Sequence, residues 1–349
     1  MTNQTGSTAR QPLLDGMRGI AAFCVMLGHV RFNTGYFQPL EFSYLFVDYF
    51  FLLSGFVLTL GVEHKIGSRR AAWGFIKARA VRFWPMVVAG ALIGALVYGM
   101  KTDWSAISVL LFLLVTNAFM IPAPVHGRSL FELNVPQWSL MYELLANVAH
   151  ALVLRHLSEA ALLRTAIVLG GLLAFWITVY GTNDLGAMTS NVPAGLTRVG
   201  FAYVLGIWMA RRRLRVGEPT RSFVPWWVAL LLPVALIMLI PGFADRALAE
   251  MIFAIAVIPL TFALLINEKA PAALAPVLSW MGALSFPLYA IHQPILSFAT
   301  IQFDGIWTAT FAISASVALA QVLAITIEAR RKKPLAADKA PAPARNANA

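Results

Sequence analysis

An arginine and a histidine interrupt an otherwise apolar segment near the start of the chain, LLDGMRGIAAFCVMLGHV, residues 13–30. Arg18 and His29 are 11 residues apart, which in a helix is about three turns, so both side chains lie on one face, roughly 16 Å apart along the axis. Arginine binds phosphate and histidine transfers protons near neutral pH. The pair predicts a cavity that holds a phosphorylated cofactor at Arg18 with its reactive end at His29. The alternative is an arginine that anchors the helix at the membrane surface and a histidine at the helix end.

Acidic and hydroxyl side chains lie in a second apolar segment, LFVDYFFLLSGFVLTL. Asp48 is near one end of it and is either interfacial or part of the cavity. Ser54 and Gly55 lie in its middle, and such a pair in a membrane helix more often indicates close helix packing than chemistry.

The sequence QWSLMYELL places Trp138, Ser139, Tyr142 and Glu143 at the start of another apolar segment. Trp138 and Tyr142 share a helix face and also suit an aromatic belt at the membrane surface. A carboxylate inside an apolar helix needs a partner or a water-filled cavity, which makes Glu143 a functional candidate. His150, two turns further on, lies either below Glu143 or near the membrane surface.

Two more ionisable residues fall inside apolar segments. Arg198, in LTRVGFAYVLG, needs an anionic partner there, and both Glu143 and Asp48 are candidates. His292, in SFPLYAIHQP, precedes Pro294, so it is either functional or a histidine that forms hydrogen bonds at a helix kink.

A basic run, KARAVRFWP, places Lys77, Arg79 and Arg82 at one mouth of a further apolar segment. Such a run either anchors the membrane topology or attracts an anionic cofactor that enters from the cytosol.

The composition indicates the class of protein that holds these residues. Hydrophobic residues make up 59% of the chain and charged residues 12%, with a mean hydropathy of +0.72, whereas soluble domains are about 45–50% apolar and about 25% charged. The net charge of +11 is concentrated between apolar segments, which is typical of cytoplasmic loops rather than of nucleic-acid binding. Cys24 is the only cysteine, so internal disulfides and a cysteine metal site are excluded, and no metal is expected.

Eleven apolar segments are long enough, or nearly so, to cross a bilayer. They cover about residues 14–31, 44–62, 83–100, 105–121, 137–154, 163–181, 197–210, 224–241, 247–266, 280–301 and 307–327. Basic loops at 64–82, 155–164, 211–221 and 328–334 are expected in the cytoplasm. These loops require an odd number of crossings between Trp104 and Arg155, so one of the two segments there, 105–121 or 137–154, does not span. Because 137–154 ends at the basic Arg155 and runs from outside to inside, 105–121 is favoured as the re-entrant or interfacial segment.

The predicted fold is therefore an all-α bundle of about ten transmembrane helices plus that one segment, with both termini cytoplasmic. Residues 1–12 form a tail without a cleaved signal peptide, 13–328 the membrane domain, and 329–349 an Ala- and Pro-rich tail that is expected to be disordered. The sequence shows no phosphate-binding glycine loop, paired-histidine metal signature or nucleophile elbow of a soluble enzyme.

Six motifs, in chain order, resemble those of the acyltransferase 3 family of integral membrane O-acyltransferases. They read LDGMRGIAAFCVMLGH, VDYFFLLSGF, RAVRFWP, WSLMYE, RVGFAYVLG and SFPLYAIH and extend over roughly residues 12–327. Family members often carry a second carboxylate after the fourth motif, where this chain reads WSLMYELLAN and has none.

The resemblance implies transfer of an acyl group, often acetyl, from cytosolic acyl-CoA to a hydroxyl of an extracytoplasmic or lipid-linked glycan in the bacterial inner membrane. His29 would then be the essential base or acyl carrier, and Glu143 a second catalytic candidate. The predicted donor residues are Arg18, Lys77, Arg79 and Arg82. The predicted acceptor residues are Asp48, Trp138, Ser139, Tyr142, Arg198 and His292.

The expected partners are acyl-CoA (acetyl-CoA above all), a carbohydrate or glycolipid acceptor, and membrane lipid, with no nucleic acid; a separate extracytoplasmic partner stays open. So do the acyl group and the acceptor, which ranges from a surface polysaccharide or peptidoglycan to a small metabolite. The rival interpretation is a transporter or flippase that uses the same intramembrane charges. Release of free CoA in the presence of acceptor would distinguish the two.

Overall fold

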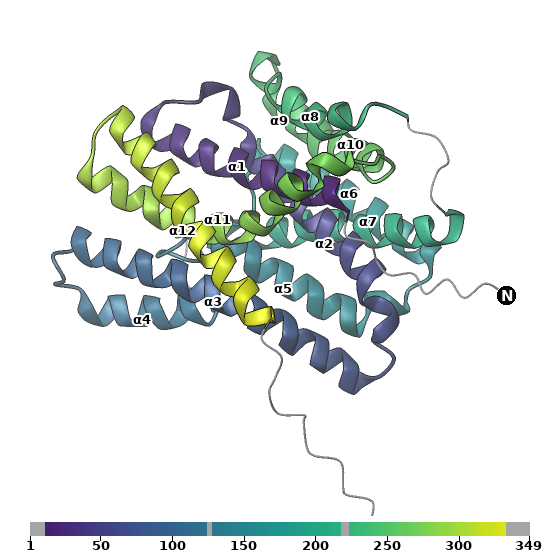
Figure 1. Ribbon diagram of the computed structural model, residues 1–349, viewed down its shortest axis with the longest axis horizontal. Helices are drawn as coiled ribbons and strands as arrows, with labels where there is room; N and C mark the ends of the chain where they lie inside the picture. The colour runs from purple at the N-terminus through teal and green to yellow at the C-terminus, as the bar shows by residue number, and fades with distance from the viewer. Residues whose placement is uncertain (1–10, 124–127, 218–222, 333–349) are drawn as a thin grey trace, which may run out of the picture.

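The computed structural model describes residues 11–123, 128–217 and 223–332, and within those ranges the regular elements are helices (Figure 1). One isolated antiparallel bridge joins Ser129 and Met188. The predicted tails fall almost wholly outside the described residues. The helices are α1 (Pro12–Thr34), α2 (Val47–Gly61), α3 (Arg69–Lys101), α4 (Ile107–Ala118), α5 (Gln137–Leu152), α6 (Glu159–Tyr180), α7 (Val192–Val216), α8 (Trp226–Ile237), α9 (Arg246–Ile252), α10 (Ile258–Leu265), α11 (Ala275–Gln302) and α12 (Ile306–Lys332).

Eight helical stretches in the described residues are long and apolar enough to cross a membrane. They contain α1, α2, α3, α6, α7, α9 with α10, α11 and α12, the α9–α10 stretch being continuous through the π-helical segment Phe253–Val257. The fold class predicted from the sequence is thus confirmed, but the count of ten is not, because α5 has 16 residues and α8 has 12.

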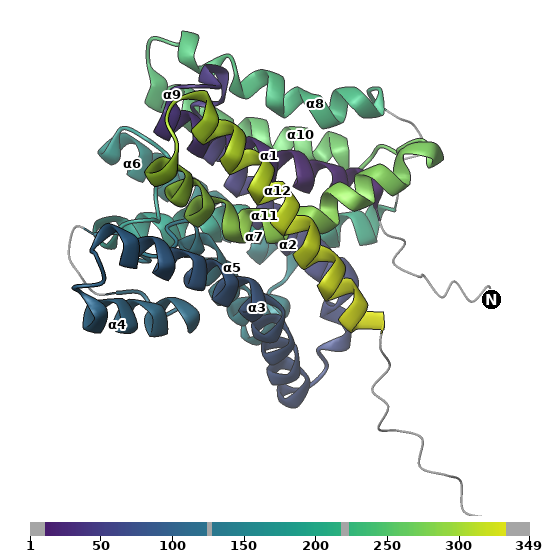
Figure 2. The same cartoon turned by 60° about the vertical axis from the view of Figure 1, so that its left-hand side comes forward.

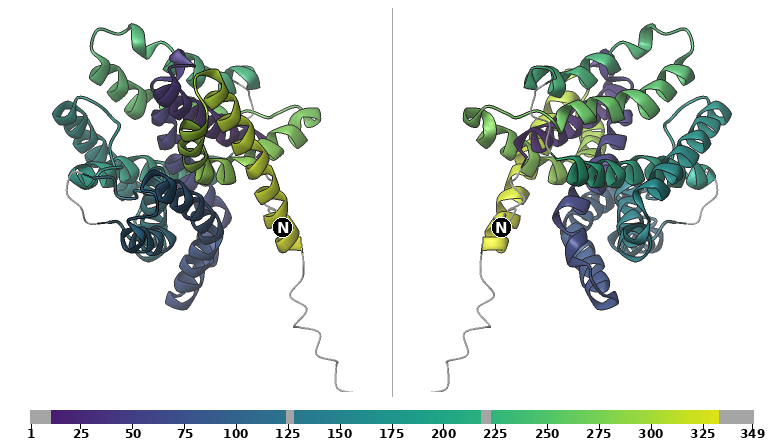
Figure 3. Two further views of the ribbon diagram at one scale, coloured as in Figure 1. Left: turned by 90° about the vertical axis from the view of Figure 1, so that its left-hand side faces the viewer. Right: turned by 90° about the vertical axis from the view of Figure 1, so that its right-hand side faces the viewer.

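The segment predicted not to cross is helix α4, which has 12 residues. At 1.5 Å per residue it is about 18 Å long, well short of the roughly 30 Å hydrocarbon core. It lies beside α3, and α8, α9 and α10 gather on the other side of the bundle (Figures 2 and 3).

Small residues allow the helices that carry the candidate site to approach closely. A Cβ atom on Gly55 of α2 would lie 2.2 Å from the carbonyl oxygen of Tyr203 in α7, and one on Gly206 of α7 would lie 2.1 Å from that of Leu52. The packing role predicted for Gly55 is therefore confirmed, and it fixes α2 against α7.

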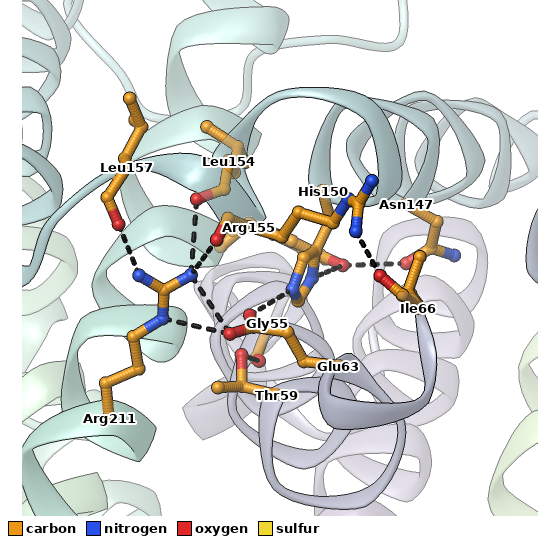
Figure 4. Close-up of polar contacts among 11 residues, drawn as sticks. Gly55, Thr59, Glu63, Ile66, Asn147, His150, Leu154, Arg155, Leu157 and Arg211 are labelled. Carbon is orange, nitrogen blue, oxygen red and sulfur yellow. Dashed lines mark hydrogen bonds and ion pairs between the residues drawn. The ribbon is translucent and has the colours of Figure 1, made fainter. Parts of the chain in front are cut away.

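A cluster of charged side chains ties together one end of the bundle (Figure 4). Glu63, in the turn after α2, accepts hydrogen bonds from Arg211 Nε at 3.1 Å and from His150 Nε2 at 2.7 Å. Arg155 donates to the carbonyl of Ile66 in the same turn. His150 thus lies near this end of α5, bonded to Glu63 and to the Tyr203 hydroxyl rather than to Glu143.

Arg211 also donates hydrogen bonds to backbone carbonyls of the turn that follows α5. The acceptors are the carbonyl oxygens of Leu154, Arg155 and Leu157. The predicted basic loops at 64–82 and 155–164 and the start of 211–221 therefore meet at one end of the bundle, as the loop parity requires.

The ionised carboxylate of Glu63 makes a pH-dependent contribution to the free energy of unfolding. Burial raises the pKa of its carboxyl, but the hydrogen bonds from His150 and Arg211 outweigh burial and hold the pKa below its ordinary value. A carboxyl with a lowered folded-state pKa stabilises the fold above its unfolded pKa, near 4.3, and this contribution is lost as pH falls through the folded-state value.

Glu63→Gln is therefore expected to lower the thermal stability of the detergent-solubilised protein at pH 7. The gap between variant and wild type should close as pH falls below about 4.3. Glu159→Gln is the matched control, because its partner Arg215 is 61% exposed and surface pairs contribute little. A gap that stays constant from pH 7 to pH 3 would contradict this account.

A proline in α11 explains a hydrogen bond between α11 and the loop before α5. Pro294 has no N–H, so the carbonyl of Ala290 loses its helical donor, and Asn134 Nδ2 donates to it instead at 2.8 Å. This contact joins the loop before α5 to the part of α11 that carries His292.

Asn134→Ala is expected to destabilise the protein by about 1–3 kcal/mol, the cost of leaving a buried carbonyl without a donor. Equilibrium unfolding in detergent measures it. Thr178→Ala serves as control, since the exposed Thr178 hydroxyl bonds only to a carbonyl of its own helix. Equal stability of the two variants would show that the Asn134 contact has no such role.

Candidate active site

A cavity of about 110 Å³ lies between α1, α2, α3, α5 and α11. Its charged and hydroxyl lining is Arg18, Ser54, Arg79, Arg82, Ser139, Glu143 and Ser285, and its aromatic lining is Phe50, Phe51, Phe83, Phe286 and Tyr289. Five residues singled out in the sequence thus meet at one cavity although they come from three different helices. Lys77 is not among its lining residues and is exposed on α3.

Arg18 reaches from α1 to α11. Its Nε donates to Ser285 Oγ at 2.9 Å and its Nη2 to the carbonyl of Gly282 at 2.6 Å, and Asp15 lies 3.2 Å from the same Nη2. The side chain therefore bonds to a neighbouring helix at the cavity wall, which is not the geometry of an arginine that only anchors a helix at the membrane surface.

Glu143 receives two donors on one oxygen. Arg79 Nη2 lies 3.0 Å and Ser54 Oγ 2.7 Å from Glu143 Oε1. The guanidinium of Arg79 also lies over the ring of Phe83, 5.0 Å from its centre. Ser54 is thus a cavity residue, although the sequence favoured packing over chemistry for the Ser-Gly pair; Gly55 has the packing role.

The cavity is electropositive. Three arginines and one carboxylate, that of Glu143, line it. Such a surface attracts an anionic ligand, and arginine forms bidentate bonds to phosphate.

His29 and His292 form a pair. His29 Nδ1 lies 2.8 Å from His292 Nε2, and the two rings stack with centres 5.0 Å apart and planes 19° apart. His292 Nδ1 lies 2.9 Å from the carbonyl oxygen of Tyr289 and 3.1 Å from that of Leu288. Two histidines that are 263 residues apart in the chain thus share one hydrogen bond.

Tyr289 connects this pair to the cavity. Its ring lines the cavity and lies 5.8 Å from the ring of His292, and its hydroxyl lies 2.8 Å from Ser139 Oγ. Phe50, also at the cavity, packs edge-on against Tyr289 at 5.4 Å. Arg18 therefore lines the cavity directly, whereas His29 is not among the lining residues and is linked to the cavity through His292 and Tyr289.

The remaining predicted acceptor residues lie in the core outside the cavity. Arg198 and Asp48, 0% and 4% exposed at their side chains, are paired at 2.7 Å, so Asp48 and not Glu143 is the anionic partner of Arg198. Asn183 donates to Asp48 at 3.1 Å. Arg198 also donates to the carbonyls of Tyr44 and Leu185, which leaves the pair fully engaged within the protein.

Trp138 and Tyr142 pack beside this ion pair. The Arg198 guanidinium lies 5.6 Å from the Trp138 ring centre, and the Tyr142 ring lies 5.8 Å from that of Trp138. The buried Tyr142 hydroxyl has no hydrogen-bond partner among the residues that the structure describes. Of the six predicted acceptor residues, Ser139 lines the cavity and His292 contacts His29, while these four support the core.

Comparisons with known proteins agree with the motifs. A family model described as "Acyltransferase domain" matches residues 12–327. "Protein 2 in picA locus" from Rhizobium radiobacter is 36% identical over 173 residues, which are 45% of this chain and 87% of that protein. No solved structure matches. Because the model covers most of the chain, the protein belongs to the acyltransferase 3 family and is a membrane acyltransferase.

Proposed function

We propose that this protein transfers an acyl group, with acetyl as the expected group, from acyl-CoA to a hydroxyl of an extracytoplasmic or lipid-linked glycan. The observation that carries the proposal is the arginine-lined cavity, which Tyr289 connects to the His29–His292 pair. We place the protein in the bacterial inner membrane.

The charge and the position of the cavity arginines support binding of acyl-CoA at this cavity. CoA carries several phosphates, and the guanidinium groups of Arg18, Arg79 and Arg82 attract them toward the cavity, with the exposed Arg82 bonding to those that stay outside it. We infer that the thioester end of the donor, rather than its nucleotide, enters this cavity between the helices. The nucleotide then lies outside the cavity, at the basic end of the bundle, which the positive-inside rule assigns to the cytoplasm together with both termini.

The reaction needs one base. His29 Nε2 takes the proton of the acceptor hydroxyl while the hydroxyl oxygen attacks the thioester carbonyl. A C–O bond forms, the C–S bond breaks, and the departing CoA thiolate takes the proton from His29. In the alternative route the acyl group moves first to His29 and then to the acceptor. Both routes require the thioester to pass Phe50 and Tyr289.

The test uses the purified protein in lipid nanodiscs with acetyl-CoA and glycolipid extracted from a strain that lacks the gene. We expect acceptor-dependent release of CoA and acetyl groups on the glycan, detected by mass spectrometry. Movement of glycan across vesicles without any CoA release would instead identify a transporter. Surface glycans of the deletion strain should lack the same acyl groups, which would name the acceptor.

Arg82→Gln is expected to raise the KM for acyl-CoA about 10- to 100-fold, because a hydrogen bond to a charged group contributes about 1.5–3 kcal/mol and each 1.4 kcal/mol is tenfold. The kcat should change much less, since the phosphates lie far from the reacting bond. Steady-state kinetics with varied acyl-CoA measure both constants.

Arg69→Gln is the matched control for that variant. Arg69 lies on the same helix, is exposed and does not line the cavity. A similar rise in KM for both variants would indicate general attraction by the basic end of the bundle rather than a site at Arg82.

A further inference from the structure

We propose that His292 is a positioning residue that fixes the tautomer of His29, so that the nitrogen left free to act as base or nucleophile is Nε2. The inference rests on the proposed function for its consequence in catalysis. Its structural part depends only on the hydrogen bonds of the two rings.

The backbone of α11 determines the protonation of His292 Nδ1. The Nδ1 atom of His292 lies within hydrogen-bond distance of two carbonyl oxygens, those of Tyr289 and Leu288. A carbonyl oxygen only accepts hydrogen bonds. Nδ1 of His292 must therefore carry a proton.

The other ring nitrogen of His292, Nε2, carries no proton. The residue is 1% exposed, and its ring lies against the rings of His29 and Tyr289, where an unpaired charge would be costly. A neutral imidazole with a proton on Nδ1 has a lone pair on Nε2. This lone pair faces His29 Nδ1 at 2.8 Å.

His29 must then donate from Nδ1. Since a neutral imidazole has one proton, the Nε2 atom of His29 is left with its lone pair. The two backbone carbonyls thus determine, through His292, which nitrogen of His29 is basic. Aspartate plays the corresponding part in a Ser-His-Asp triad, where it holds the histidine in the productive tautomer.

The same contact supports the transition state. When His29 Nε2 accepts the proton of the acceptor hydroxyl, His29 becomes positively charged and its Nδ1–H bond to His292 becomes charge-assisted and stronger. His292 itself forms no bond to the substrate and exchanges no proton with it. Its removal should therefore lower kcat and leave the KM for acyl-CoA unchanged.

Two variants separate this role from packing. His292→Leu introduces an apolar side chain of similar size that has no hydrogen-bond acceptor for His29. His292→Gln retains an oxygen near the position of Nε2. We expect His292→Leu to lower kcat about 10²- to 10⁴-fold, the range of general-base catalysis, with KM for acyl-CoA within about twofold. His292→Gln should recover a large part of the lost kcat. Thr300→Val, at an exposed position further along α11, should retain wild-type kinetics.

Solid-state ¹⁵N NMR of the histidine-labelled protein in lipid gives a readout besides activity. We expect His29, assigned by comparison with His29→Gln, to show protonated Nδ1 and unprotonated Nε2 in the wild type, and mixed tautomers in His292→Leu. A proton on His29 Nε2 in the wild type would overturn the inference, as would a kcat of His292→Leu within threefold of wild type.

The two readouts also distinguish the inference from the proposed function. If the protein releases no CoA but the tautomer is as expected, the proposed function fails and the structural part of the inference stands. If CoA is released and the tautomer differs, only the inference fails. Should His292→Leu not fold, the wild-type spectrum and the glutamine variant still decide the question.

Discussion

His29→Ala is expected to lower acyl transfer at least 10²- to 10⁴-fold, the contribution of a positioned general base. The KM for acyl-CoA should stay within a fewfold of wild type, because Arg18, Arg79 and Arg82 line the cavity that His29 does not reach. Initial rates of glycan acylation in nanodiscs, at saturating donor, measure the loss. His64→Ala is the matched control, since His64 is exposed in the turn after α2. Near-wild-type transfer by His29→Ala would remove His29 from the mechanism.

The same protein distinguishes the two chemical routes. Wild-type protein mixed with labelled acyl-CoA in the absence of acceptor either acquires a label on His29 or does not. A label released on addition of acceptor would establish the route through an acyl-histidine and exclude direct attack. A histidine that stays unlabelled while acceptor triggers immediate product formation would favour direct attack.

Arg198→Met is expected to cause the largest loss of stability, about 3–5 kcal/mol, because it leaves the Asp48 carboxylate buried without its partner. The double variant Arg198→Met with Asp48→Asn should recover part of this loss, since it removes the charge as well. Equilibrium unfolding in detergent measures both. Arg246→Met is the matched control: Arg246 is 55% exposed in its pair with Glu41, and such pairs contribute about 0–1 kcal/mol.

This prediction also tests whether Asp48 and Arg198 bind the acceptor. A pair that only supports the fold lowers the amount of folded enzyme, and the kinetic constants per folded molecule stay near wild type. A stable Arg198→Met variant with a raised KM for the acceptor would instead return both residues to the substrate site.

The parts of the fold that depend on local pattern were predictable. Apolar segments and basic loops gave the helices and their relative ends, and charge parity singled out the segment that became α4, which is too short to span. The count of ten is not confirmed, because α5 and α8 are shorter than a spanning helix and apolar loop residues beside them extended the predicted segments.

The site was only partly predictable because helical periodicity places residues on a face without saying what covers that face. Arg18 and His29 share a face of α1, yet Arg18 bonds to Ser285 and His29 to His292, about two turns apart on α11. Asp48 was one of two possible partners for Arg198, and only the register of α2 against α7 decides between them.

Tyr289 was predictable from the sequence as a residue next to His292. It lies three residues before His292, so the two share a helix face, and a hydroxyl-bearing ring beside a candidate histidine was a usable signal. Glu63 gave no such signal, because its partners His150 and Arg211 are 87 and 148 residues away and a single charge in a basic loop has many possible neighbours.

The lining of the cavity has a consequence for biogenesis. The wall begins with Arg18 in α1 and is completed only by Ser285, Phe286 and Tyr289 in α11, so helices from both ends of the membrane domain must be in place. A nascent chain that has inserted α1 to α10 already displays the arginines but has no wall opposite them and no partner for His29. If the proposed function holds, donor binding therefore requires the completed bundle, and a half-synthesised protein in the membrane would not consume acyl-CoA.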